Sequence, residues 1–110
     1  MKPHHGCPAQ ATIDVMSGRW KVQILWHLSF GPKRFARLRN LLPGVNEKVP
    51  ADQLRQLEND GVLHRDASPS IPPQVTYSLN GASKKIAPMM EELCDWGSQH
   101  FGIEPTQRRS

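Results

Sequence analysis

The chain has 110 residues, a formal net charge of +4 and a sequence pI of about 9.4. Its length and its hydrophobic fraction of 37% predict one folded domain that would gain from dimer burial, and its basic balance favours a polyanionic partner. No apolar run approaches the ~18 residues of a membrane-spanning helix, and nothing resembles a signal peptide. Two cysteines make no disulfide framework, so we expect the cytoplasm, which in a bacterium includes the nucleoid.

The first predicted helix begins at Pro8, because proline is favoured at the first helical position. Ile13 and Met16 follow three residues apart and give this helix an apolar side. The Ser-Gly pair at 17–18 ends it. Residues 1–6, which precede the helix, are mostly polar, and we expect them to be flexible.

A second helix is predicted in the segment RWKVQILWHLS. Trp20, Ile24 and Leu28 recur every four residues, which is the spacing of a buried stripe on one helix face. Trp26 lies off that stripe, so we expect it to be half exposed or packed on another subunit. We expect His27 to be an ordinary surface histidine, or a buried one with its hydrogen bonds satisfied, rather than a ligand.

A short third helix is predicted after a break at residues 30–32. Phe35, Leu38 and Leu42 give it an apolar side of about two turns, and a single rung of strand precedes it. Four cations lie on or beside its open side, where they form either a set of phosphate contacts or a solvated basic face: Lys33, Arg34, Arg37 and Arg39.

The stretch Pro43–Arg65 predicts a helix bounded by turn residues, with Asn46 able to cap its start and Gly61 able to stop it. On a wheel of about 100° per residue, Leu54 and Leu57 share one side. A polar stripe lies opposite, formed by Lys48, Asp52 and Arg55. Two helices joined by a short turn form a helix-turn-helix, whose second helix can read a DNA major groove. The alternative is a surface helix whose carboxylate pairs with its basic neighbours.

Period-two patterning follows the glycine stop. Val62 and Leu63 lead into a loop rich in serine and proline, and Val75–Leu79 returns as a second short strand. The two strands predict a β-hairpin with a stiff tip, because the prolines limit the conformations of the loop. A hairpin directly after a helix-turn-helix is a wing, so the order of elements predicts a winged helix and favours DNA binding.

The last predicted helix follows Asn80, which can cap it. Pro88 lies inside this helix and should kink it or divide it after Ala87. The apolar stripe of the helix is broader than one small core needs and is rich in methionine, which favours a dimer face over a cofactor site. The polar tail, residues 102–110, is expected to be flexible.

Taken together, the chain resembles the HxlR-type winged helix-turn-helix transcription regulators of bacteria. The matching strings are CPAQATIDVMSGRWKVQILWHL, GPKRFARLRNLLPGVNEK, LRQLENDGVLHRDASPSIPPQVTYSL and PMMEELCDWG, which run from Cys7 to about His100. The resemblance implies one domain over residues 7–101, mainly α with a small β-hairpin. It also implies a sequence-specific regulator that binds double-stranded DNA.

The resemblance further implies a homodimer joined by the first and last helices, with two reading helices in successive major grooves of an inverted-repeat operator. The wing, Ser68–Gln74, would lie along the adjacent backbone or minor groove. The expected DNA-contacting residues are Lys33, Arg34, Arg37, Asn46, Lys48, Ala51, Asp52, Arg55, Ser68, Ser70 and Gln74. The expected dimer residues are Ile13, Met16, Met89, Met90, Leu93, Trp96 and Phe101.

Two residues depart from the family pattern. Pro50 stands where the family generally has a large apolar residue in the first turns of the reading helix. A helix starting at Glu47 would lack an N–H for the Asn46 carbonyl, so the start could move to Val49 or Pro50. Asp52 stands where members often carry an amide, and its carboxylate opposes phosphates unless it accepts from cytosine N4. The list of base contacts depends on both residues.

Enzyme function finds no support in the sequence, which has no glycine-rich phosphate loop, no paired metal motif and no recognisable Ser/His/Asp arrangement. No cofactor is expected. Two other classes stay open. His4, His5 and Cys7 offer three soft or borderline ligands within four residues, which would suit a metal-responsive regulator. A winged helix used only as a protein-interaction module would show no salt-dependent DNA binding.

Cys7 is a candidate redox sensor. It stands at the start of the first helix, where free N–H groups and the positive end of the helix dipole stabilise a thiolate. The resemblance implies a sensor of oxidants or electrophiles at this position, whose modification would move the first helix and the spacing of the reading helices. The alternative is a small packing residue and N-cap. Cys94, in the apolar stripe, is expected to be inert.

Overall fold

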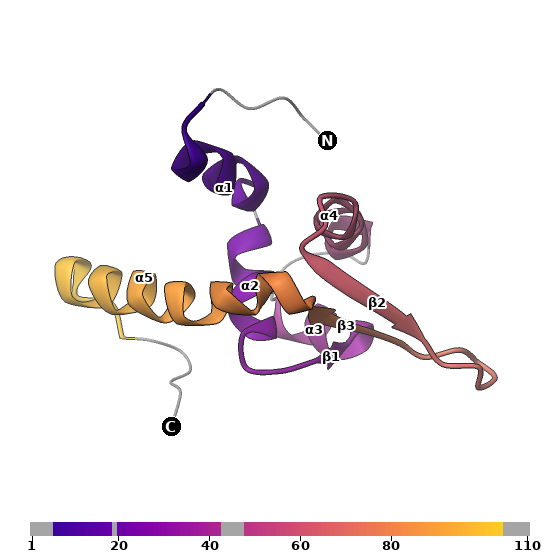
Figure 1. The fold of residues 1–110 in the computed structure, drawn as a ribbon. Coiled ribbons are helices and arrows are strands. Elements are labelled where there is room, and N and C mark those ends of the chain that lie inside the picture. Colours follow the sequence, from indigo (N-terminus) through magenta and orange to yellow (C-terminus); the bar gives the residue numbers. More distant parts are fainter. Residues whose placement is uncertain (1–5, 19, 43–47, 105–110) are drawn as a thin grey trace.

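The computed structural model describes residues 6–18, 20–42 and 48–104 and, for 48–50, the backbone alone. The elements are α1 (Pro8–Met16), α2 (Lys21–Leu28), β1 (Lys33–Arg34), α3 (Phe35–Leu41), α4 (Lys48–Asn59), β2 (Leu63–Ala67), β3 (Val75–Leu79), η1 (Gly81–Lys85) and α5 (Ile86–Phe101). A hairpin of β2 and β3 extends from one side of a helical body, and α5 extends from the other (Figure 1). The predicted fold, a winged helix-turn-helix with a long last helix, is confirmed.

One apolar core joins α2, α3, α4 and the sheet. Its buried residues are Ile24, Leu25, Leu28, Leu38, Leu42, Leu54, Leu57, Val62, Leu63, Tyr77, Leu79 and Met90. Burying a side chain of this size stabilises a fold by roughly 1.5–3 kcal/mol relative to leaving it exposed. The predicted apolar sides of the second, third and reading helices are confirmed, because their isoleucine and leucine residues form this core. In contrast, α1 has no fully buried residue and packs on the core through half-buried Val15 and Met16.

The reading helix α4 has a start and an end that its sequence explains. Counted from Lys48, Pro50 is the third residue, so the N–H that it lacks belongs to the first turn, where helices leave N–H groups unpaired. At the other end, the Gly61 N–H donates to the Glu58 carbonyl over 3.0 Å. Gly61 has a φ of 80°, which glycine adopts at little cost. The predicted glycine stop is confirmed.

The sheet has three antiparallel strands in the order β1-β3-β2. β2 and β3 pair as far as Ala67 opposite Val75, and beyond that pair the Ser68 N–H donates to the Gln74 carbonyl over 2.8 Å. The two-residue β1 pairs with β3, which confirms the predicted rung before α3. The sheet therefore fixes the base of the wing directly beside the start of α3.

Asn80 caps the segment that leads into α5. Its side-chain oxygen accepts from the Ser83 N–H over 2.9 Å, at the start of the 3₁₀ turn η1, and α5 begins at Ile86. The predicted kink or division after Ala87 is wrong. Pro88 is the third residue of α5, so its missing N–H again lies in a first turn, where it breaks no hydrogen bond within the helix.

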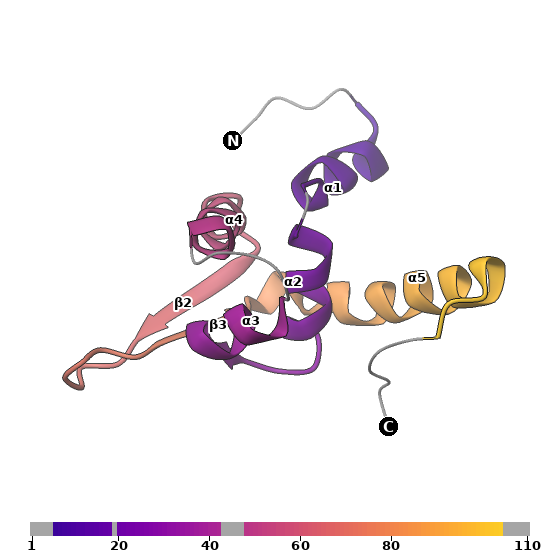
Figure 2. The same ribbon diagram turned by 180° about the vertical axis from the view of Figure 1, so that it is seen from behind.

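The hairpin and the free end of α5 lie on opposite sides of the molecule. The two opposite views agree that α4 and the hairpin lie on one side and the free end of α5 on the other, with α1 beyond the start of α2 (Figures 1 and 2). None of the described helices is long and apolar enough to cross a membrane.

Candidate nucleic-acid interface

The reading helix turns its polar stripe away from the core. Leu54 and Leu57 are fully buried, whereas the Arg55 side chain is 69% exposed and the Asp52 side chain 43%. Ala51, another predicted contact, lies next to Asp52 in the sequence and is half-buried. Arg55 Nη1 lies 3.7 Å from Asp52 Oδ1, which is one of the pairs that the surface-helix alternative predicted. An exposed pair contributes about 0–1 kcal/mol, so the guanidinium can exchange this carboxylate for a base edge at little cost.

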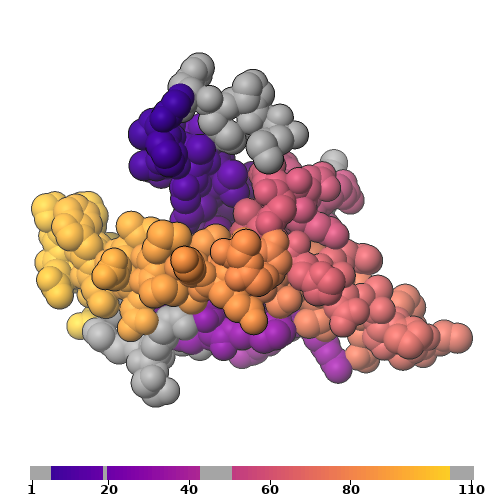
Figure 3. Space-filling model, in the orientation of Figure 1, coloured from indigo at the N-terminus to yellow at the C-terminus, as the bar shows by residue number. Residues whose placement is uncertain are grey.

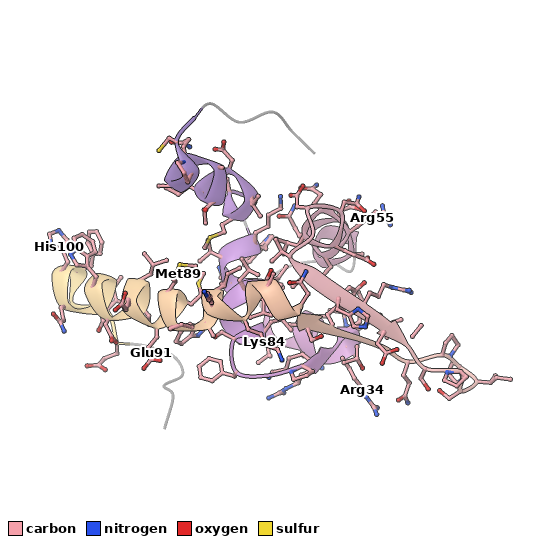
Figure 4. All side chains as sticks on the ribbon, in the orientation of Figure 1. Arg34, Arg55, Lys84, Met89, Glu91 and His100 are labelled. Carbon is pink, nitrogen blue, oxygen red and sulfur yellow. The ribbon has the colours of Figure 1, made fainter. Side chains whose placement is uncertain are left out.

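β1 and the start of α3 add cations. Arg34 and Arg37 are exposed, and Lys33 is half-buried. The Arg34 side chain projects from the half of the molecule that also carries Arg55 and the hairpin (Figure 4). Arg39, the fourth predicted cation of this segment, is half-buried. The exposed guanidinium groups of this segment can contact phosphate oxygens without first breaking a packed structure.

The wing loop, Ser68–Gln74, has hydrogen bonds of its own. Ser68 Oγ donates to Ser70 Oγ over 3.1 Å, and Ser70 Oγ donates to a loop carbonyl over 3.1 Å. Ser68 is half-buried, while Ser70 and Gln74 are exposed. Ile71, near the tip, is 97% exposed. Because these bonds and the prolines hold the loop in shape, docking it on a nucleic acid would cost less conformational entropy than docking a flexible loop.

A shallow groove of about 340 Å³ lies where the wing meets α3. Its walls are formed by Arg34, Phe35 and Ala36 on one side and by Pro73, Gln74, Val75 and Tyr77 on the other. The groove therefore brings together a guanidinium and a carboxamide from two predicted contact segments. Both groups can donate to a phosphate oxygen.

Two predicted contacts are not placed. Asn46 lies outside the described residues, and of Lys48 only the backbone is described. The remaining predicted contacts lie on α4, on β1 and α3, and on the wing. These three segments share the side of the molecule from which the hairpin extends (Figures 1 and 2).

A second surface, on α5 and α1, is apolar. Its exposed residues are Ile13 (57%), Met89 (44%), Leu93 (58%), Trp96 (61%) and Phe101 (65%). Met89 and His100 point to the side of α5 on which α1 lies, whereas Glu91 points to the opposite side (Figure 4). The end of α5 and α1 both stand out from the body (Figure 3). Exposed apolar side chains gathered in this way on a small protein are typical of an interaction surface.

Met90 does not belong to that surface. It is 2% exposed and forms part of the core, so its assignment to the dimer face is wrong. The next residue along a helix points about 100° away, and α5 packs on α2 through the side that carries Met90 rather than Met89. Met16 is half-buried against the same core.

The two cysteines lie in different surroundings. Cys7 is exposed at the N-cap position of α1, and its side chain makes no capping hydrogen bond. Cys94 is half-buried and lines a groove of about 410 Å³ between α2 and α5. His4 and His5 lie outside the described residues. Within the described part of the chain, no three His, Cys, Asp or Glu side chains gather as a metal site.

A family model described as HxlR-like helix-turn-helix matches residues 15–105. The chain belongs to this family. The HTH-type transcriptional regulator YdeP of Bacillus subtilis, itself named as uncharacterized, is 40% identical over 95 residues, which is 86% of this chain and 74% of YdeP. The redox regulator HypR in its reduced form gives a TM-score of 0.80 at 34% identity, covering 86% of this chain and 93% of HypR. The reduced form of the transcriptional regulator YodB from B. subtilis gives a TM-score of 0.72 at 27% sequence identity. This match covers 86% of this chain and 94% of YodB.

The structure of this HxlR-like chain adds two exposed polar residues that the sequence analysis did not select. Gln56 is exposed on α4 beside Arg55, and Arg65 is exposed on β2. Arg65 pairs with Tyr77, which also pairs with Lys33, so these side chains are neighbours on one face of the sheet. Strand alternation would have identified Arg65, but the patterning predicted a first strand of only two residues.

His27 differs from its prediction. It is half-buried, and its Nδ1 atom is buried without a hydrogen-bond partner among the described residues, so a fully satisfied histidine is wrong. Burial lowers the pKa of His27, and the positive charges of Lys33 and Arg37 lower it further. The imidazole therefore resists protonation next to two of the expected DNA contacts.

We expect the free energy of unfolding to fall as the pH is lowered through about 6.5. Unfolded His27 takes up a proton near its ordinary pKa of 6.5, whereas the folded chain takes it up only at lower pH. The unfolded state then binds more protons, so acid favours it. His27→Gln should flatten the decline of Tm below about pH 6.5.

The matched control is Gln23→Ala, at an exposed residue of α2 that has no titratable side chain, which should leave the dependence of Tm on pH unchanged. Equal slopes for His27→Gln and the unmodified chain would contradict this account.

Proposed function

We propose that this protein is a sequence-specific transcription regulator that binds double-stranded DNA as a homodimer. The main support is the common side on which the polar stripe of α4, the cations of β1 and α3, and the wing lie, in a chain of the HxlR-like family. In this proposal α4 enters the major groove and Arg55 reaches base edges. Arg34 and Arg37 contact phosphates, and the wing follows the adjacent backbone or minor groove.

The apolar surface on α5 and α1 supports the homodimer. Two copies joined there would carry two reading helices about 34 Å apart, which fits an inverted repeat with half-site centres one helical turn apart. The net charge of +4 adds long-range attraction to DNA. With DNA as its partner, the proposed place of action is the nucleoid in the cytoplasm.

A gel shift on the DNA upstream of the protein's own gene tests the proposal. We expect one retarded species on a fragment that contains an inverted repeat, with an affinity that falls steeply as salt rises, because phosphate contacts release counterions. A fragment with one half-site scrambled is the control. Equal affinity for every fragment would contradict sequence-specific binding. Binding of no fragment at low salt would favour the protein-interaction module instead.

We also propose that Cys7 senses oxidants or electrophiles. The exposed N-cap position of its thiol supports this role, as does the likeness to HypR, which is described as a redox regulator. The Cys7 thiol would add to a C=C bond of a quinone. Its sulfur forms a thioether with a ring carbon as the C=C π bond breaks, and the thiol proton ends on a ring oxygen. Because Cys7 begins α1, its modification would change how α1 sits in the dimer and thus the spacing of the reading helices.

Treatment with a quinone should change the operator affinity of the unmodified protein by about tenfold, a coupling within the usual range for two sites. Cys7→Ser should abolish the response, because serine does not form the adduct. Cys94→Ser is the matched control and should respond like the unmodified protein, since Cys94 is half-buried. If all three proteins respond alike, or none does, Cys7 is a structural residue.

A further inference from the structure

Gly18, in the turn between α1 and α2, lies close to the reading helix. Gly18 has a φ of 133°, which favours glycine, and a Cβ at this position would meet Gln53 Oε1 of α4 at 2.9 Å. The Cδ and Cε atoms of Lys21 lie 3.4 and 3.6 Å from the same Cβ position. The α1–α2 turn, the start of α2 and the middle of α4 therefore come together at these three residues.

This junction is partly buried and partly polar. Lys21 is 7% exposed, and Gln53 Oε1 is buried without a hydrogen-bond partner among the described residues. Burying polar groups in this way costs free energy, so a junction selected for stability alone would carry apolar side chains. The stem of Lys21 lies on the same side of Gly18 as the end of Gln53, so a methyl group at Gly18 would contact both side chains.

Gln53 also lies next to the residues that α4 presents to solvent. It directly follows Asp52 and stands two residues before Arg55, with buried Leu54 between them. A contact on Gln53 therefore acts on the same helical turn that carries both polar-stripe residues. At the other end of the contact, α1 has no fully buried residue to hold it against a displacement.

We propose that Gln53 is a positioning residue, which sets the place of the reading helix according to the conformation of the α1–α2 turn at Gly18. A change in the position of α1 against the core is transmitted to α4 through this contact. The effect on operator binding rests on the proposed DNA-binding function, but the contact itself does not.

A double-mutant cycle on the full-length protein tests this proposal. Gly18→Ala places a methyl group against Gln53 Oε1, so it should speed hydrogen exchange of the α4 amides and lower operator affinity, each by roughly fivefold, as for residues in contact. Gln53→Ala removes the atom that the methyl group meets. In that background, Gly18→Ala should change either quantity by less than about twofold.

Gly31→Ala is the matched control for backbone strain. Gly31 has a φ of 139°, close to that of Gly18, but a Cβ there meets nothing within 4 Å. Its effect should therefore be the same with and without Gln53. If Gly18→Ala also has the same effect in both backgrounds, the proposal is overturned.

The two readouts separate this proposal from the proposed function. Hydrogen exchange reports the contact without DNA, so coupling in exchange without any operator binding would reject only the DNA-binding function. Additive effects in exchange would overturn the contact even if the operator binds tightly.

If Gly18→Ala does not fold, a second variant still tests the contact between the turn and α4. Gln53→Ala alone should speed hydrogen exchange of the Ile24 and Leu25 amides, which are hydrogen-bonded at the start of α2, by roughly fivefold, because the contact acts in both directions. Gln56→Ala, at an exposed residue of the same helix, should leave these amides unchanged. Unchanged exchange in Gln53→Ala would overturn the proposal.

Discussion

A chain carrying Leu93→Asp should sediment as a monomer of about 12.4 kDa and lose about 100-fold in affinity for an inverted repeat. Leu93 is 58% exposed, so the substitution costs the folded monomer little. At the proposed dimer interface the same carboxylate would be buried without a partner, which opposes association. Without the second protomer the operator is held by one reading helix, and the gain from bivalent binding disappears. Sedimentation equilibrium and gel shifts measure the two effects.

Ile71→Asp is the matched control. It makes the same chemical change at a residue of the wing that is 97% exposed, far from α5, so the dimer mass should be unchanged. A dimer that survives Leu93→Asp would show that the copies associate through another surface. An unmodified chain that sediments as a monomer would reject the proposed homodimer.

The helices could be predicted because burial repeats along the sequence with the period of a helix. Ile24 and Leu28, or Leu54 and Leu57, are recognisable without knowing what they pack against. The choice between two neighbouring apolar residues is a different problem. Met89 and Met90 both fit the stripe of α5, and only the position of α2 decides that Met90 enters the core.

The candidate interface was predictable to the extent that it depends on the order of elements. A helix-turn-helix followed by a hairpin places Arg34, Arg55 and the wing together, whatever the details of packing. The surroundings of His27 depend instead on how α2 lies against α3, which brings the charge of Arg37 near the imidazole. The contact between Gly18 and Gln53 joins residues far apart in the sequence, and no local pattern carries that information.

Arg55→Ala should weaken binding to the preferred operator by roughly 1–3 kcal/mol and binding to random DNA far less. Its side chain is 69% exposed on the polar stripe of α4, away from the buried leucines, where it can reach a base edge. A bidentate contact with guanine would account for that loss, because random sites seldom offer the same base in the same place. Competition gel shifts with specific and random duplexes measure the ratio.

Arg34→Ala is the comparison that gives the Arg55 result its meaning. A phosphate contact carries no sequence information, so this variant should weaken binding to specific and random DNA about equally. It should also flatten the salt dependence of the binding constant by ~0.9 in the log–log slope.

The ion pair between Arg55 and Asp52 is too weak to account for the loss of affinity in Arg55→Ala. Asp52→Ala should tighten binding to random DNA slightly, because it removes a charge that opposes phosphates. If Arg55→Ala behaves like Arg34→Ala, the polar stripe faces the backbone, and another side of α4 reads the bases.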